Sequence, residues 1–353
     1  MNKLKKITSH HLFLPVFALI LLLLFNAFFT PGFFKIQFQN GQLFGRSIDI
    51  LNRASILVIL ALGMTLVIAT GGIDISQGSV IAISGAVSCF LIGGAGDGTA
   101  KVPLILACLA AIFVCAVLGA WNGFLVSKLK IQPMIATLIL LTAGRGIAML
   151  ITKGQNITVY YKPFAYIGNT IPGSILPSTI FIALAMVLIV LLIMKKTSIG
   201  MFIQSVGINS KASYYTGIKV TTIVFMVYVF SGVCAGIAGI MESSMIAAAD
   251  PNNAGVNMEL DAILAVALGG TLLSGGRFYI GGSIIGAITI QTMTTTLYAL
   301  GVSSEQLPVY KAVVVVLICL LQSEAFKEMF KARILKIMSK GETTSTRKAV
   351  SKI

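Results

Sequence analysis

The chain has 353 residues, of which 57% are apolar and only 10% are charged. Soluble domains carry about 25% charged residues, so this composition excludes an ordinary water-soluble enzyme. The formal charge of +15 comes from 26 Lys and Arg against 11 Asp and Glu. Most of these cations flank apolar segments, and no basic patch is interleaved with the aromatic residues that nucleic-acid sites use. We therefore expect a protein of the lipid bilayer that does not bind nucleic acid.

Apolar segments recur along the chain, separated by Gly, Pro and charged residues. Each bilayer crossing needs roughly 20 predominantly apolar residues. The segments lie at 12–29, 54–70, 75–93, 103–126, 133–152, 174–194, 220–246, 262–273, 280–298 and 307–323. This pattern predicts an all-α polytopic membrane protein with about ten transmembrane helices, some of them broken. We expect one transmembrane domain over residues 1–326, followed by a basic tail over residues 327–353.

The first apolar segment follows KLKK, as a secretory signal peptide would. It is long for a signal peptide and lacks a small-residue cleavage site, so we interpret it as an uncleaved first span. Lys and Arg are retained in cytoplasmic loops during insertion. With the N-terminus inside, ten crossings place the basic loops 127–132, 195–219 and 274–279 and the tail inside as well. Both termini are therefore expected to be cytoplasmic.

Two regions have glycine-rich interruptions. GGIDIS divides residues 54–93, and the segment 262–273 is too short for a full crossing. The sequences ALGMTLVIATGGIDISQGSVIAISGA (61–86) and ALGGTLLSGGRFYIGGSIIGA (267–287) share an ALG-x-T start, a GG break and a G-S-x-I continuation. Such segments in two halves of a chain indicate structural repeats with a substrate path between them. Chance similarity between glycine-rich sequences is the alternative.

Charged residues at membrane depth are costly and indicate function. Here the candidates are Asp74, Arg145, Glu242 and Asp261. We predict a polar substrate path for a hydroxyl-rich solute, lined by Asp74, Asn122, Thr137, Arg145, Asn253 and Asp261. The structural alternative is that Arg145 pairs with an acid and that Asp74 caps a half-helix. The two interpretations are compatible, because a break that shapes a cavity still needs a cap.

The glycine motifs and the positions of the histidines limit the kinds of functional site that the chain can form. The G-x-x-x-G pairs predict close helix contacts rather than ligand sites, and they lie at Gly119/Gly123, Gly232/Gly236 and Gly282/Gly286. No glycine cluster ends in G-K-[ST], so we expect no P-loop. The only histidines, His10 and His11, precede the first span, which leaves His-based catalysis or zinc binding no residue within the membrane. We therefore expect neither a catalytic nor a metal site.

The segment KKTSIGMFIQSVGINSKASYYTGIK (195–219) differs from the apolar segments. It predicts a short helix, a turn at Gly207 and a second short helix. Ile199, Phe202, Ile203 and Val206 recur at helical spacing, which gives one apolar face without the length to cross a bilayer. The segment is either a docking element for a cytosolic partner or a loop lying on lipid headgroups.

Several motifs occur in an order typical of one family. IDILNRASILVILALGMTLVIATGGIDISQGSVIAISGAV, IQPMIATLILLTAGRGIAMLITKG and NNAGVNMELDAILAVALGGTLLSGGR resemble permease subunits of bacterial ABC sugar importers of the ribose type. GQLFGRSIDILNRA, GMFIQSVGIN and NNAGVNMELDAILAV resemble the galactofuranose-importer subgroup in particular. The resemblance extends over about residues 40–325 and is less specific for the sugar than for the family.

The resemblance implies a permease of the bacterial plasma (inner) membrane that carries out no chemistry and binds no cofactor. Its partners would be an ABC ATPase that uses ATP on the cytosolic side, an extracytoplasmic sugar-binding protein and a second permease. The second permease is a different chain in the galactofuranose subgroup and an identical one in the ribose subgroup.

Residues 198–217 would be the ATPase-coupling segment, shaped by Gly207, Asn209, Ala212 and Gly217. The usual pattern G-G-N-x-x-A-A is altered by Ile208 and Ser213. A different class of protein, an ion-coupled secondary transporter or channel, would also suit the breaks and buried charges. It would leave the amphipathic inner segment without a role.

Overall fold

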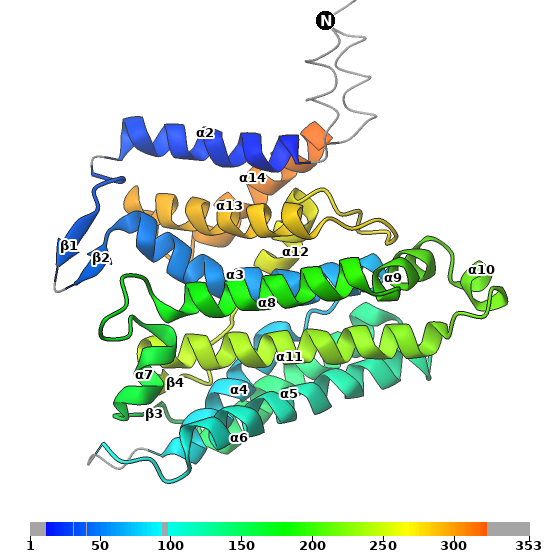
Figure 1. The fold of residues 1–353 in the computed structure, drawn as a ribbon, viewed down its shortest axis with the longest axis horizontal. Coiled ribbons are helices and arrows are strands. Elements are labelled where there is room, and N and C mark those ends of the chain that lie inside the picture. Colours follow the sequence, from blue (N-terminus) through cyan, green and yellow to red (C-terminus); the bar gives the residue numbers. More distant parts are fainter. Residues whose placement is uncertain (1–11, 31, 40, 94–97, 323–353) are drawn as a thin grey trace, which may run out of the picture. The chain divides into compact units, whose positions relative to one another are not determined.

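The computed structural model describes residues 12–30, 32–39, 41–93 and 98–322. It separates into two compact units, Met1–Gly301 and Val302–Ile353. The predicted tail 327–353 and the first lysines lie outside the described residues. The helices of the first unit are α2 (Phe13–Phe29), α3 (Arg46–Ala69), α4 (Gln77–Ile92), α5 (Leu104–Ser127), α6 (Pro133–Thr152), α7 (Lys162–Gly168), α8 (Ser178–Lys196), α9 (Ile199–Ile208), α10 (Ser210–Tyr215), α11 (Val220–Ile246), α12 (Met258–Leu268) and α13 (Ile280–Ala299) (Figure 1). The second unit contributes α14 (Leu307–Gln322).

A helix corresponds to each of the ten apolar segments predicted from the sequence, so the mostly helical fold is confirmed. Five of these helices, α3, α5, α6, α8 and α11, are long and apolar enough to cross a membrane by themselves. The others are shorter or less apolar. In Figure 1 the long helices of the first unit run alongside one another, with α9 and α10 at one end and the small sheets at the other.

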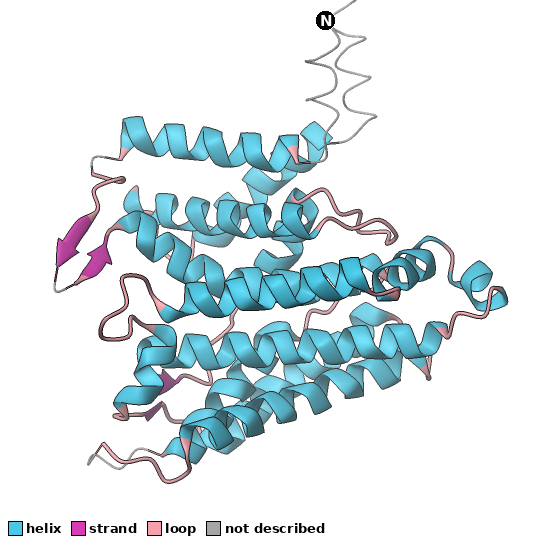
Figure 2. Ribbon diagram, in the orientation of Figure 1, coloured by secondary structure: helices cyan, strands magenta, loops and turns pink. Residues whose placement is uncertain are grey.

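Two short antiparallel sheets were not predicted (Figure 2). β1 (Gln37–Gln39) pairs with β2 (Gln42–Phe44) as a hairpin. β3 (Ile157–Thr158) pairs with β4 (Ala248–Ala249), which joins the chain after α6 to the chain after α11. Strands of two or three residues are too short to produce a recognisable alternation of side chains, so the sequence pattern could not have revealed them.

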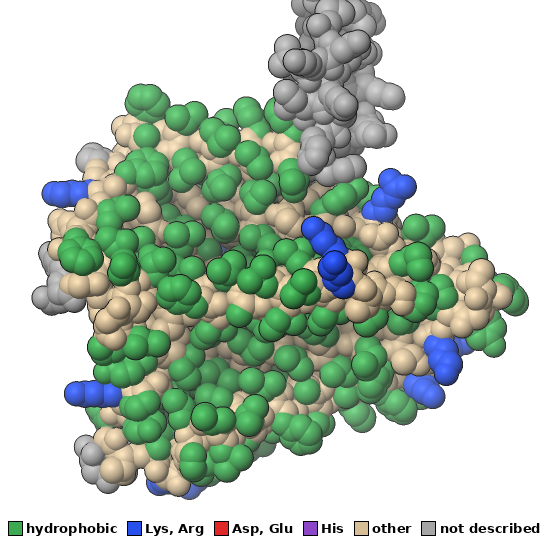
Figure 3. Space-filling view, in the orientation of Figure 1, with side chains coloured by type: hydrophobic (Ala, Val, Ile, Leu, Met, Phe, Trp, Pro, Cys, Tyr) green, Lys and Arg blue, Asp and Glu red, His purple; other side chains and the backbone are tan. Residues whose placement is uncertain are grey.

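Helix α3 lies at the centre of the first unit. Every residue from Ala54 to Ala69 is buried, and the helix packs against α8, α11, α12 and α13. A helix that is apolar all round is stable only when it is surrounded, which fits this position. Outer helices instead expose large apolar side chains, among them Phe113, Leu150 and Leu192. Apolar side chains cover most of the face in Figure 3, as expected for a surface in contact with lipid tails.

The G-x-x-x-G pairs lie where helices touch. Gly119 of α5 faces Gly232 of α11, and a Cβ built on Gly119 would lie 3.1 Å from the Cα of Gly232. On α13, a Cβ on Gly282 or Gly286 would overlap the backbone of α12 at Gly269 or Ala265. Small residues let helix backbones approach and gain dispersion contacts that lipid cannot replace. The predicted packing role is confirmed at these glycines.

The two glycine-rich breaks meet. Residues 70–76 separate α3 from α4, and residues 269–279 separate α12 from α13. The N–H of Gly276, in the second break, donates to the carbonyl oxygen of Ala69 at 2.9 Å. This bond joins the second break to the end of α3, where the first break begins. The predicted likeness between 61–86 and 267–287 therefore has a structural counterpart, because each stretch contains a helix end, a break and a helix start.

Helix α9 packs against both breaks. A Cβ on Gly207 would overlap the carbonyl oxygen of Ala69 and lie 2.5 Å from the nitrogen of Gly276. The predicted turn at Gly207 is wrong, since Gly207 lies inside α9 and the direction changes at Asn209, whose backbone is extended. The Asn209 side chain accepts from the N–H of Ala212 at 3.0 Å and caps α10, as asparagine does well. The small size of Gly207 serves close packing instead.

The predicted apolar face of α9 is partly confirmed. Ile203 and Val206 are 1% exposed, and Ile203 packs with Leu66, Val67 and Tyr228. Ile199, at the start of the helix, is 40% exposed instead.

Candidate functional site

The break between α3 and α4 is held by hydrogen bonds around Asp74, which is 2% exposed. One carboxylate oxygen of Asp74 accepts from the N–H of Ser76 at 3.1 Å and from its hydroxyl at 2.6 Å. The other oxygen accepts from the hydroxyl of Ser231 at 2.7 Å. Asn122 donates to the Ser76 hydroxyl at 2.9 Å. We call Asp74, Ser76, Asn122, Ser231 and Gln77 the break network.

Two further contacts extend the break network. Gln77 donates from its amide to the Ser231 hydroxyl at 2.9 Å. The Thr137 hydroxyl of α6 accepts from the N–H of Ile75 at 3.3 Å, while it donates to the Pro133 carbonyl at 2.9 Å. Of the six predicted path residues, the structure thus brings Asp74, Asn122 and Thr137 together around one break. Asp74 orders the turn that leads into α4, which agrees with the structural alternative for this residue.

Arg145 of α6 is half-buried and organises a second cluster. Its guanidinium donates to the carbonyl oxygens of Pro251 at 3.2 Å and of Ala254 at 2.6 Å. The carboxyl groups of Glu259, Glu242 and Asp250 act electrostatically on it. Arg145 therefore ties the loop that precedes α12 to α6, and we call this group the arginine cluster.

Glu242 and Glu259 belong to the arginine cluster but not to the predicted path. Glu242 accepts from the N–H of Gly255 at 3.2 Å, and Glu259 is 6% exposed with its carboxylate against Gly78. One oxygen of each carboxylate has no hydrogen-bond partner among the described residues. Glu259 could have been identified from its spacing, because it shares a helix face with Ala262 and Val266, which are both fully buried.

Asn253 and Asp261 lie at the edge of the arginine cluster. Asn253 is exposed, and its amide donates to Asp250 at 2.8 Å. Asp261 is partly buried in the first turn of α12, and its charge acts on Glu259. Asp250 lies in the loop between β4 and α12, outside the helices. Burial alone would raise the pKa of Asp250, but hydrogen bonds from Asn253 and Asn252 outweigh it and hold the pKa below its usual value.

Buried polar atoms without a hydrogen-bond partner occur in both clusters. Six side-chain atoms have no hydrogen-bond partner within the described part of the chain, on Ser127, Tyr228, Asn122, Gln77, Glu259 and Glu242. Two of these residues belong to the break network and two to the arginine cluster. Gly78, against which Glu259 packs, follows Gln77 directly. Leaving a buried polar atom unpaired costs roughly 1–3 kcal/mol, so each of these atoms could be stabilised by a bound polar group.

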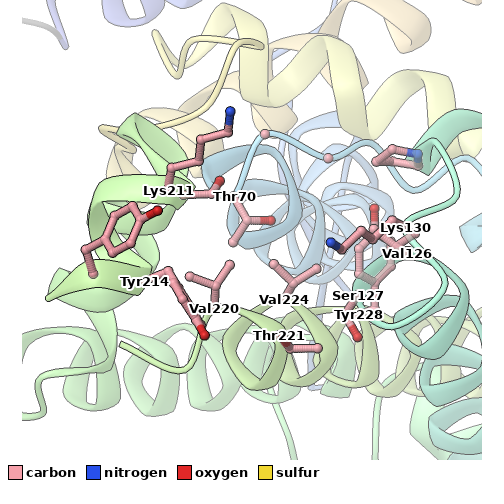
Figure 4. Close-up of a pocket in the computed structure, with 15 residues that line it drawn as sticks. Thr70, Val126, Ser127, Lys130, Lys211, Tyr214, Val220, Thr221, Val224 and Tyr228 are labelled. Atoms are coloured by element: carbon pink, nitrogen blue, oxygen red, sulfur yellow. The ribbon is translucent and has the colours of Figure 1, made fainter. Parts of the chain in front are cut away.

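A cavity of about 670 Å³ opens near α9 and α10. Thr70, Gly71 and Gly72 of the first break contribute to its wall, together with the α5–α6 connection, α10 and the start of α11 (Figure 4). Tyr228, whose hydroxyl is one of the six unpaired atoms, lines it as well. The cavity thus lies between the break network and the surface near α10.

The four predicted coupling residues lie in or beside α9 and α10. Gly207 contacts the breaks, and Asn209 caps α10 by accepting from Ala212. Gly217 follows α10 with a φ of +87°, in a left-handed conformation that glycine adopts without strain. As for metals, the described residues contain no group of three or more His, Cys, Asp or Glu side chains that could hold an ion.

The fold and the site define a class of protein: a helical permease of the membrane, with discontinuous helices and polar side chains at its centre. Comparison with known families agrees. Residues 47–322 match the family described as the permease component of the branched-chain amino acid transport system. The chain belongs to this permease family.

Individual relatives resemble the chain over most of its length. It is 46% identical over 317 residues to the galactofuranose transporter permease protein YtfT of Escherichia coli K12, covering 89% of this chain and 90% of that protein. It is 38% identical to the fructose import permease protein FruF of Bifidobacterium longum, with 96% of each chain covered. It is 36% identical to the ribose import permease protein RbsC of Escherichia coli K12, with 87% and 92% covered. No solved structure matches the chain.

These relatives confirm the resemblance to permeases of ribose-type sugar importers that the motifs predicted. Three of them are named for different sugars at identities of 36% or more, so the family relationship supports sugar import in general. It does not distinguish one sugar from another.

Proposed function

We propose that this chain is the transmembrane permease subunit of an ATP-driven ABC importer that moves a monosaccharide into the bacterial cytoplasm. The sugar would be galactofuranose or a related pentose or hexose. The observation that carries the proposal is the similarity to three sugar permeases over at least 87% of the chain. The packing of α9 against both glycine-rich breaks supports it, because this contact connects a peripheral segment to the discontinuous helices at the centre.

The proposed substrate path uses both clusters. Arg145, Asn253 and Asp261 are at least partly exposed and would contact the sugar first, since hydroxyl groups can both donate to carboxylates and amides and accept from a guanidinium. Asp74, Asn122 and Thr137 are buried and would meet it only when the break between α3 and α4 moves. The unpaired polar atoms of Asn122, Gln77, Glu242 and Glu259 would offer the sugar hydroxyls further partners.

The proposed coupling segment is 198–217, with Gly207, Asn209, Ala212 and Gly217. An ABC ATPase would bind it and hydrolyse ATP, so this chain would need neither a catalytic site nor a cofactor. The remaining partners would be an extracytoplasmic sugar-binding protein and a second permease, either a different chain or a second copy. In this arrangement ten helices cross the plasma (inner) membrane and both termini are cytoplasmic.

Reconstituted transport tests the proposal against the ion-coupled alternative. The chain is co-purified with its partners, placed in proteoliposomes with the sugar-binding protein, and assayed for uptake of labelled galactose and ribose. We expect uptake with ATP and none with an ion gradient alone. Arg145→Gln should reduce uptake, and Lys153→Gln, an exposed position at the end of the same helix, should not. Uptake driven by an ion gradient without nucleotide would instead establish a secondary transporter.

A further inference from the structure

The cavity beside α10 has a basic and hydroxyl-rich lining that sugar translocation does not explain. Lys130 lies on one side of it, and Lys211 and Tyr214 lie on the other, with Thr70 between them (Figure 4). None of the 15 lining residues carries a carboxylate. A neutral sugar requires no such excess of positive charge, whereas an anion does.

Two buried hydroxyl groups point to a ligand. Tyr228 is fully buried, and its hydroxyl has no hydrogen-bond partner among the residues that the structure describes. That oxygen lies 2.5 Å from where a Cβ on Gly72 would be, so it reaches the part of the cavity that Gly72 lines. The hydroxyl of Ser127, another lining residue, is also buried and unpaired. Each hydroxyl can donate one hydrogen bond to a bound acceptor.

The backbone adds to the positive potential of the cavity. Helices α6 and α11 begin at Pro133 and Val220, which both line it, and a helix N-terminus carries about half a positive charge. Lys130 has a φ of +54°, a left-handed conformation that costs a non-glycine residue about 1–2 kcal/mol. The connection between α5 and α6 thus holds Lys130 at the edge of the cavity despite this cost.

We propose that this cavity binds a phosphate group, and that a soluble sugar phosphate is the ligand class that fits it. A phosphate has three strong acceptor oxygens, which the two ammonium groups and the buried hydroxyls would satisfy. Tyr214 and Tyr215 line the cavity and offer aromatic faces to a sugar ring. A volume of about 670 Å³ lies in the range of small-molecule sites. An anionic lipid headgroup offers the same phosphate chemistry and is the other source.

Because the cavity lies between α10 and the α5–α6 connection, a bound ligand would hold these two parts together. A ligand held by both Lys130 and Lys211 connects α10 to the α5–α6 connection, and α10 follows the segment that packs on both breaks. This inference rests on the proposed function, in which residues 198–217 couple to the ATPase. The bound ligand then restrains that segment. A sugar phosphate is the product of a kinase reaction on an imported sugar, so its accumulation would slow further import.

Binding is measured on the purified chain in nanodiscs, which needs neither the ATPase nor transport. Glucose 6-phosphate is titrated calorimetrically in phosphatidylcholine nanodiscs, with glucose as the control ligand. We expect saturable binding of the phosphate ester alone. The Lys130→Gln, Lys211→Gln double variant should bind at least about tenfold more weakly, because charge-assisted hydrogen bonds to phosphate are strong. Lys128→Gln, in the same connection but outside the lining, should bind normally.

A second set of nanodiscs containing phosphatidylglycerol distinguishes the two sources. If the headgroup is the ligand, this lipid will be retained through purification by the parent chain and lost from the double variant, and it will displace glucose 6-phosphate. Either result supports a phosphate site. The proposal is overturned if neither probe binds, or if binding survives in the double variant. Unchanged elution and melting temperature of each variant exclude misfolding. Because uptake is not measured, failure here leaves the importer assignment intact.

Discussion

Asp74 is a buried carboxylate whose hydrogen bonds, from Ser76 and Ser231, all come from within the chain. They join the break to α11 and direct the chain from the end of α3 into the start of α4. Both carboxylate oxygens of Asp74 already accept hydrogen bonds, so its first role is to hold the conformation of the break without any solute bound. A break that is ordered by one side chain should be sensitive to that side chain.

Replacing Asp74 with Ala should destabilise the folded protein. The substitution leaves the Ser76 and Ser231 hydroxyls without their acceptor, and each buried donor left unpaired costs roughly 1–3 kcal/mol. We expect a lower midpoint of thermal unfolding, measured by loss of the monodisperse peak of detergent-solubilised protein after heating. Asp49→Ala, an exposed aspartate in the first turn of α3, is the control. Equal midpoints for the two variants would contradict the role assigned to Asp74.

Asp250 gives the loop between β4 and α12 a dependence on pH. Its pKa in the folded protein lies below the ordinary value of 3.8 because the hydrogen bonds from Asn253 and Asn252 outweigh the effect of burial. The ionised carboxylate therefore stabilises the folded loop at pH values above 3.8, and this contribution is lost as the pH falls through the lower folded value. The group is partly exposed and lies in a loop, so the effect should be local.

Hydrogen exchange can test this behaviour. Protection of the Asn252 and Asn253 amides, corrected for the intrinsic exchange rate, should be constant near neutral pH and fall only below pH 3.8. Asp250→Asn should lower protection at neutral pH and remove the acid transition. A transition of unchanged position in the variant would show that another group controls the loop.

At the scale of elements, the packing of helix α9 depends on the absence of a side chain at Gly207. Gly207→Ala places a methyl group against the Ala69 carbonyl and the Gly276 amide, which are backbone atoms that cannot rotate away. Overpacking of this kind costs about 1–3 kcal/mol. We expect α9 to move away from the breaks, so that ATP-driven uptake falls while the chain still reaches the membrane.

Ser205→Ala on the same helix is the matched control for Gly207→Ala, because the Ser205 hydroxyl donates only to the Met201 carbonyl of its own helix. Uptake and membrane-inserted protein are measured for both variants. Normal uptake by Gly207→Ala would show that contact between α9 and the breaks is dispensable.

Ten helices were predictable because each contains an apolar run, such as 133–152, and α9 and α10 were predicted from the shorter segment 195–219. The seven-residue helix α7, KPFAYIG, has no long apolar run and was not predicted. Helix α12 was misplaced, at 262–273 rather than 258–268, since its first turn carries Glu259 and Asp261 and its predicted end lies in the break. Arg145 was recognised from its depth. Its partners were not, because it donates to backbone carbonyls, which no sequence pattern distinguishes.

The candidate site was predictable in its residue types and less so in their grouping. Asp74, Asn122 and Thr137 come from three segments, and only folding shows that they surround one break. Gln77 was missed because polar residues are common at helix starts, and Ser231 because it is a single hydroxyl within a long apolar helix. Their importance comes from burial, which a single sequence does not reveal at isolated polar positions.

At the scale of the whole molecule, the proposed topology of ten crossings would assign each connection to one side of the membrane. Cysteine labelling with a membrane-impermeant maleimide tests this. We expect Asn252→Cys to be labelled in intact spheroplasts and Ser210→Cys only after permeabilisation, because both positions are exposed but lie on opposite sides in this topology. The native thiols Cys89, Cys115 and Cys234 are buried and should contribute little background, whereas Cys108 is partly exposed, so labelling of the parent chain is subtracted.

The topology would be wrong if both positions were labelled from the same side. An inverted pattern, with Ser210→Cys labelled in intact spheroplasts, would reverse the orientation and move the coupling segment outside the cell. Gln155→Cys, an exposed position between α6 and β3, serves as a second outer site.

The eleven residues of α12 also bear on how the protein is made. A helix of this length rises about 16 Å, roughly half of the hydrocarbon thickness, and its first turn holds two acidic side chains. Such a segment is a poor substrate for the insertion machinery on its own. We expect α12 to enter the membrane together with α13, as a hairpin, after α4 and α6 are in place to receive Glu259 against Gly78 and Arg145. Membrane insertion of α12 and α13 would then depend on earlier helices having already been inserted.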